Sequence, residues 1–176
     1  VKASQSSITE WLRNLPTLPG KGKVMRYDGL EKGNQQAHHL ILDIDVGKKD
    51  LQQCADAVMR LRAEYLLSVG QEDDIHFNFT SGDNCEWKKW KQGVRPVVRS
   101  KVSWVKSASP DGSYKNFKKY MDMVFNYAGT ASLSRELKSI KLSDIEPGDV
   151  FIRGGHPGHA VTVMDVAVNG AGEKVF

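Results

Sequence analysis

Two residues of this 176-residue chain, Cys54 and His159, have the types and positions that thiol chemistry needs. Cys54 falls in the first turn of a segment with helical periodicity, where the helix dipole and the unpaired amide donors favour the thiolate. The same amides can hold an oxyanion. On position alone, a core role for Cys54 is favoured, because it is in register with Leu51 and Val58 on an apolar stripe and free cysteine is usually buried.

His159 comes directly after a Gly-Gly-His-Pro-Gly loop and begins an apolar stretch typical of a strand. A histidine at the entry of a strand is accessible and fixed in position, and a base that pairs with a thiol needs both properties. Taken alone, His159 fits better as a strand-end histidine bonded to a backbone carbonyl, and His156 is a rival base. Together, a cysteine at a helix start and a distant histidine at a strand start predict a cysteine hydrolase.

A third catalytic residue is not found on the strand that His159 begins. Asp165 shares a strand face with His159 but lies about 20 Å along the strand, too far to orient the imidazole. Residues 173–176 look like the returning strand of a hairpin, and the chain stops inside that element. We therefore expect a single domain over residues 1–176 that lacks its last strand or strands.

The elements that must position the pair are a helix and a strand. Asp50, with Gln53 three residues later, resembles a capping box and predicts a helix from there to Gly70. Further helices are predicted at residues 8–15, 87–90, 114–129 and 130–137. Strands are predicted at residues 40–46, 75–79, 102–105, 149–152 and 159–168, the last being the longest. Helices first and in the middle, with the clearest strands at the end, predict an α+β fold.

The composition excludes several classes of protein. Apolar residues make up 40% of the chain and charged residues 26%, which excludes a disordered chain. No apolar run is long enough to span a membrane. A net charge of +4 on 25 basic and 21 acidic residues is a poor argument for nucleic acid. Two cysteines are too few for a disulfide scaffold or a four-cysteine zinc site.

Other residue groups are weaker candidates. Cys54 and Cys85 could form a disulfide in an oxidising compartment, which would abolish the nucleophile. Asp43 and Asp45 could bind a cation, but no third ligand is spaced to join them. Three tryptophans could line a sugar- or peptide-binding groove, although core packing is their default role: Trp87, Trp90 and Trp104.

Residues 144–152, followed by Gly158-His159-Ala160, resemble the His segment of papain-like bacterial amidases and peptidases of the CHAP and NlpC types. In that segment a Pro-Gly-Asp turn feeds a strand and a Gly-His opens the next. The resemblance implies a papain-like (cysteine-proteinase-like) fold, with N-terminal helices packed on a C-terminal antiparallel sheet. It also implies that His159 is the base, that the nucleophile begins an earlier helix as Cys54 does, and that the third polar residue falls just past Phe176.

Across nearly its whole length the chain also resembles an uncharacterised bacterial family, the domain of unknown function 4846. The stretches that carry this resemblance are residues 42–47, 51–65, 77–82 and 147–166. The resemblance supplies no established activity. It implies an exported protein of the periplasm or cell envelope and a domain that continues beyond Phe176.

We expect a cell-envelope thiol hydrolase that cuts an amide, plausibly in a peptidoglycan peptide, with Cys54 as nucleophile and His159 as base. The alternative is a catalytically inactive domain of the same fold that binds a cell-wall or glycan ligand through a Trp-lined groove. No metal or organic cofactor, no nucleic acid and no membrane span are expected, and the oligomeric state is left open.

Overall fold

The structure, a computed structural model, describes residues 7–176 and contains both helices and strands. Its α-helices are α1 (Ile8–Arg13), α2 (Cys54–Ser68), α3 (Trp87–Lys91), α4 (Tyr114–Tyr127) and α5 (Thr130–Glu136). Two short 3-10 turns are η1 (Glu72–Asp74) and η2 (Leu142–Asp144). None of the helices within residues 7–176 is long and apolar enough to cross a bilayer.

The strands form four separate antiparallel pairs. In chain order they are β1 (His76–Asn78) with β2 (Asn84–Glu86), β3 (Val94–Val98) with β4 (Val102–Lys106), β5 (Val150–Arg153) with β6 (His159–Thr162), and β7 (Ala167–Val168) with β8 (Lys174–Val175). In the third pair, Arg153 lies opposite His159 and Val150 lies opposite Thr162.

The main core lies between α2, α3, α4 and the β1–β2 pair. Trp87, Phe117 and Tyr120 are fully buried there, with the rings of Trp87 and Phe117 packed edge to face at 5.4 Å between centroids. The Tyr120 hydroxyl donates a hydrogen bond to the Cys85 carbonyl at 2.8 Å, so the buried phenol is paired. Ser113 caps α4 by accepting from the Asn116 amide, as its position before the apolar stripe predicts.

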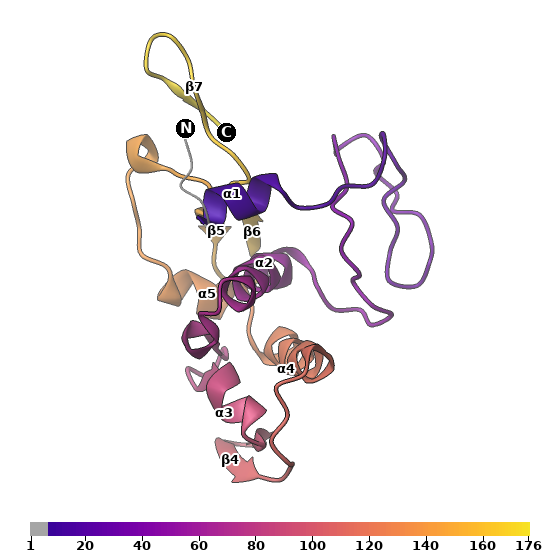
Figure 1. Ribbon diagram of the computed structural model, residues 1–176, viewed down its shortest axis with the longest axis vertical. Coiled ribbons are helices and arrows are strands. Elements are labelled where there is room, and N and C mark those ends of the chain that lie inside the picture. Colours follow the sequence, from indigo (N-terminus) through magenta and orange to yellow (C-terminus); the bar gives the residue numbers. More distant parts are fainter. Residues whose placement is uncertain (1–6) are drawn as a thin grey trace.

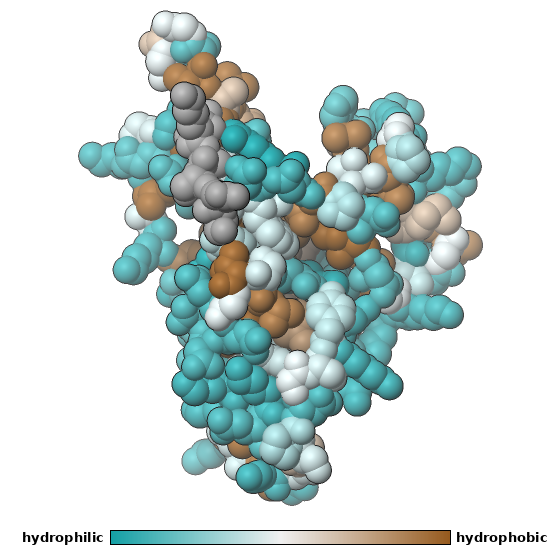
Figure 2. Space-filling model, viewed as in Figure 1, coloured by the Kyte–Doolittle hydropathy of each residue, from teal (hydrophilic) through white to brown (hydrophobic). Residues whose placement is uncertain are grey.

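Figure 1 shows how the other elements surround α2, which lies beside the β5–β6 pair. The chain between α1 and α2 extends to one side as a long arm, residues 15–53, without helices or named strands. The β7–β8 hairpin projects at the top of this view, at the end of the molecule away from β4. Figure 2 shows apolar side chains gathered on this hairpin, where Val168 and Val175 are exposed, and in the recess beside the arm.

The fold class is α+β, as predicted, but two details of the predicted arrangement are wrong. The helices are not all N-terminal, because α4 and α5 follow two of the strand pairs. The C-terminal strands form two separate pairs, β5–β6 and β7–β8, instead of one sheet.

The prediction of a strand at residues 40–46 is also wrong. This segment belongs to the arm and pairs only through one isolated bridge between Thr17 and Leu42. Asp45 of this segment contacts helices instead: its carboxylate accepts a hydrogen bond from Lys118, and its backbone carbonyl accepts one from Arg60. Within residues 7–176 this bridge is its only strand-like pairing, so the period-2 pattern has no sheet to join.

The strand that His159 begins is shorter than predicted. β6 ends at Thr162, because the chain turns away after Val163, whose amide donates to the Asp149 carbonyl at 2.8 Å. Asp165 then bonds Arg13 of α1, and residues 167–168 pair with β8 instead. The predicted hairpin around residues 170–172 is confirmed as the β7–β8 turn.

The buried aromatic cluster gives a direct test of this core. Replacing Phe117 by alanine removes a fully buried ring and should lower the free energy of unfolding by about 3–5 kcal/mol. The matched control is Phe151→Ala, because Phe151 is 42% exposed and its loss should change stability by about 1 kcal/mol or less. Urea unfolding followed by circular dichroism measures both. Equal losses in the two variants would contradict this description of the core.

Candidate functional site

Cys54 is the first helical residue of α2, closer to the helix end than predicted. The predicted cap at Asp50 is wrong, because Gln52 has a left-handed φ of 68° and no helix can run through it. The helix is capped instead from Gln53, whose amide donates to the Asp56 carboxylate at 3.0 Å. The Cys54 side chain is half-buried, and it therefore lies among the unpaired amides of the first turn without being sealed from solvent.

Helix α1 contacts both the C-terminal half of α2 and the residues beside the end of β6. The Trp11 ring of α1 packs on Tyr65 of α2, with 5.9 Å between centroids. On its other side α1 touches the residues that precede β5, since a Cβ on Gly148 would lie 2.9 Å from Ile8. The Gly148 amide in turn donates to the carbonyl of Val163, just after β6, at 2.8 Å.

A cavity of about 370 Å³ lies where these elements meet, because Thr162 of β6 lines it together with Val58 and Leu66 of α2. β6 packs on α2, so the strand that His159 begins lies against the helix that Cys54 begins. Ala55 and Ala160, the neighbours of Cys54 and His159, are both buried in the same core cluster. The two predicted residues thus sit on adjacent elements.

The His159 side chain is exposed, and the Cys54 side chain is half-buried. Within residues 7–176, no hydrogen bond joins the Cys54 thiol to the His159 ring or to another side chain. The loop before His159 is held against α5: the Thr130 hydroxyl donates to the Gly155 carbonyl at 3.1 Å. A Cβ on Gly158 would lie 2.0 Å from that hydroxyl, so the residue before His159 must be glycine for this approach.

Cys85 is a core residue and not a second nucleophile. Its side chain is fully buried in β2 opposite Phe77, and both cysteines are free. Burial raises the pKa of the Cys85 thiol to about 12, with a smaller contribution from Glu86, so the thiol stays protonated at neutral pH. The disulfide with Cys54 that the sequence left open is therefore not formed in this structure.

The other candidates have structural partners. Asp165 forms a bidentate ion pair with Arg13 at 2.6 and 3.0 Å, which lowers the pKa of the Asp165 carboxyl and ties α1 to the chain after β6. Trp87 and Trp90 are buried in the core, which leaves only Trp104 of the three partly exposed. Within residues 7–176, no group of three His, Cys, Asp or Glu side chains is placed to hold a metal ion.

Sequence reasoning missed a buried charged cluster around Arg60 on α2, which is 6% exposed. Its guanidinium forms an ion pair with Glu64 at 2.7 Å and donates to the Tyr114 hydroxyl at 3.2 Å. Burial opposes the charge, but Glu64 outweighs it and the pKa of Arg60 is raised. The i, i+4 spacing of Arg60 and Glu64 was a signal for the pair, whereas nothing local indicates its burial.

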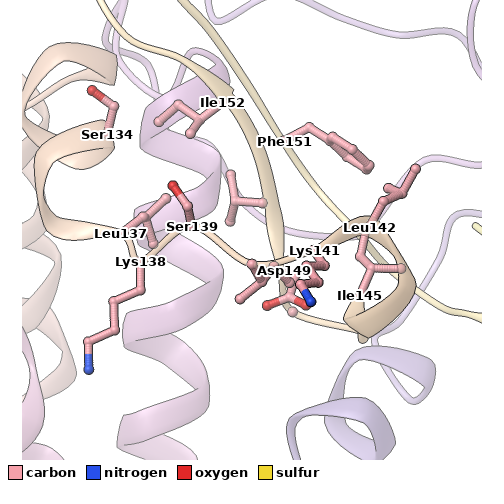
Figure 3. Close-up of a pocket in the computed structure, with 13 residues that line it drawn as sticks. Ser134, Leu137, Lys138, Ser139, Lys141, Leu142, Ile145, Asp149, Phe151 and Ile152 are labelled. Atoms are coloured by element: carbon pink, nitrogen blue, oxygen red, sulfur yellow. The ribbon is translucent and has the colours of Figure 1, made fainter.

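A further cavity, of about 420 Å³, lies elsewhere. Figure 3 shows it between β5, which contributes Phe151 and Ile152, and the segment of residues 137–145. Neither Cys54 nor His159 lines it. Its charged groups do not converge on one point, since the Asp149 carboxylate accepts from the Glu146 amide within its own turn. We therefore do not assign the thiol chemistry to this cavity.

The buried thiol of Cys85 predicts how stability depends on alkaline pH. The unfolded thiol ionises near pH 9.0 and the folded thiol only near pH 12, so the folded state holds a proton that the unfolded state loses. This contribution is complete below pH 9.0 and is lost as pH rises through 12, by up to about 1.4 kcal/mol per pH unit. Urea unfolding across this range should show a steeper loss in the wild type than in Cys85→Ala. Identical pH dependences would contradict the buried, protonated thiol.

The comparisons with known proteins agree with the resemblance found in the sequence. The model of the family described as "Domain of unknown function (4846)" matches residues 1–176. The searches of curated proteins and of solved structures found no match. Because the family model spans the whole chain, the chain belongs to the family described as Domain of unknown function (4846).

Proposed function

We propose that this chain is a papain-like thiol hydrolase that cuts an amide bond, with Cys54 as the nucleophile and His159 as the general base. One observation carries this proposal: β6, the strand that His159 begins, packs on α2, the helix that Cys54 begins. A thiol at a helix start and an imidazole at the start of an adjacent strand are the two parts that such a reaction needs.

The proposed reaction needs only the side chains of the pair, the helix amides and water. The Cys54 sulfur attacks the substrate carbonyl carbon while its proton passes to the His159 ring. The amides at the start of α2 stabilise the tetrahedral oxyanion. The C–N bond then breaks, and His159 returns the proton to the leaving amine. Water, deprotonated by His159, hydrolyses the thioester and regenerates the thiol.

As the substrate we propose a peptide of the cell envelope, such as a peptidoglycan stem peptide, on a protein exported to that compartment. The support is the resemblance of residues 144–152 and 158–160 to cell-wall amidases. The exposed side of the pair is consistent with a polymeric substrate, because the His159 side chain is open to solvent.

The proposed pair makes the reactivity of Cys54 depend on His159. In the intact protein, iodoacetamide should alkylate Cys54 faster than free cysteine at neutral pH, and His159→Ala should slow this by about tenfold or more, since the imidazole takes the thiol proton. The matched control is His156→Ala in the same loop, which should label like the wild type. Peptide mapping by mass spectrometry measures the rate at Cys54.

The same variants test the hydrolysis directly. Purified peptidoglycan peptides incubated with the protein should be cleaved by the wild type and by His156→Ala, and not by Cys54→Ala or His159→Ala. A Cys54 that labels no faster than free cysteine, and equally fast in His159→Ala, would overturn the proposal. Retention of the same peptides or glycans without cleavage would favour an inactive binding domain.

A further inference from the structure

Gln52 is the one non-glycine residue with a positive φ in the part of the chain that the structure describes, and it lies two residues before Cys54. A left-handed backbone at φ 68° is unfavourable for a side chain with a Cβ. Such a conformation persists only where the surroundings impose it, and it is concentrated at functional sites. The contacts of the Gln52 side chain impose the left-handed conformation, and this conformation sets the path of the residues that follow.

The Gln52 side chain is held at both ends of its amide. Its Nε2 donates to the Val46 carbonyl at 3.0 Å, and its Oε1 accepts from Nη1 of Arg60 at 3.0 Å. The first bond joins two residues of the arm, Gln52 and Val46. The second ties the arm to α2, the same helix that Cys54 begins.

Arg60 is a rigid partner for Gln52 because it is buried and fully engaged. Glu64 accepts from its Nε at 2.7 Å, and the Tyr114 hydroxyl of α4 accepts from its Nη2 at 3.2 Å. That hydroxyl also donates to Glu64 at 2.6 Å, which closes a triangle of hydrogen bonds. Side chains of α2 and α4 therefore hold the Arg60 guanidinium in place, and the guanidinium in turn holds the Gln52 side chain.

The residue between Gln52 and Cys54 is fixed from the helix side. The Gln53 amide donates to the Asp56 carboxylate at 3.0 Å, and its carbonyl accepts from the Ala57 amide at 2.9 Å. The chain thus enters α2 through a left-handed residue held by Arg60 and a cap held by Asp56. The direction in which the Cys54 thiol leaves the helix start depends on both.

We infer that Gln52, held by Arg60, is a positioning residue for Cys54, and that the left-handed turn it forms sets the orientation and reactivity of that thiol. This inference deepens the proposed function, on which its catalytic meaning rests. Gln52 touches no reacting atom in this account and acts only through the backbone. The competing explanation is that the Gln52 side chain serves only to anchor the arm.

Two substitutions at one position separate the explanations. Gln52→Gly and Gln52→Ala both remove the bonds to Val46 and Arg60, so both loosen the arm equally. Glycine adopts a positive φ without strain, whereas alanine does not. The rate of limited proteolysis of the arm should therefore change to the same extent in the two variants, whereas the reactivity of Cys54 should differ between them.

The readout is the pH profile of iodoacetamide alkylation at Cys54 in the full chain, which requires no turnover. We expect the rate at neutral pH to fall about fivefold or more in Gln52→Ala, because alanine does not keep the left-handed backbone at this position. Gln52→Gly and Gln52→Asn should stay within about twofold of the wild type, because both residues tolerate the left-handed region. If Gln52→Ala does not fold, Gln52→Ser replaces it.

Equal profiles in the alanine and glycine variants would overturn the inference and leave the arm-anchoring role. This outcome is independent of the proposed hydrolysis. If the alkylation profiles of the alanine and glycine variants differ but the wild type cleaves no peptide, the proposed hydrolase activity is wrong and the positioning role of Gln52 stands. If the wild type cleaves the peptides but the two variants have equal profiles, the hydrolase activity stands and the positioning role of Gln52 is wrong.

Discussion

The packing of α2 on β6 is the constraint on which the site depends. Ala55 of α2 and Ala160 of β6 are both nearly fully buried in the main core cluster, and the helix packs on the strand. Cys54 and His159, the residues before these alanines, are half-buried and exposed, so both lie at the rim of that core.

The hydrogen-bonded cluster around Arg60 attaches the arm to α2 and α4, where the apolar core does not extend. The arm between α1 and α2 is mostly exposed, and polar contacts dominate its attachment to α2 and α4, through Gln52, the Asp45 carbonyl and Lys118. A buried guanidinium without Glu64 would be strongly unfavourable, because the desolvated charge would have no carboxylate to pair with. The cluster thus couples the position of the arm to the helix start at Cys54.

The sequence predicted the elements whose signals are local. The helix starts at Ile8 and Tyr114 and the strand start at His159 are confirmed, because each depends on neighbours a few residues away. The strand at residues 40–46 and the cap at Asp50 were wrong, because long-range contacts with α2 and α4 decide the path of the arm. The position of Cys54 at a helix start was predicted correctly, whereas the buried Arg60 and the left-handed Gln52 have no signal in local patterns.

The proposed function requires that the start of β6 lies beside the start of α2, and a disulfide tests this placement most directly. In a Cys85→Ala background, His159→Cys should form a disulfide with Cys54 under mild oxidation, since a bridge requires Cα atoms within about 7 Å. Thr162→Cys, at the other end of β6, is the control and should stay reduced. Free thiols counted by intact-protein mass after alkylation report the result. A bridge at residue 162 and none at residue 159 would contradict the account.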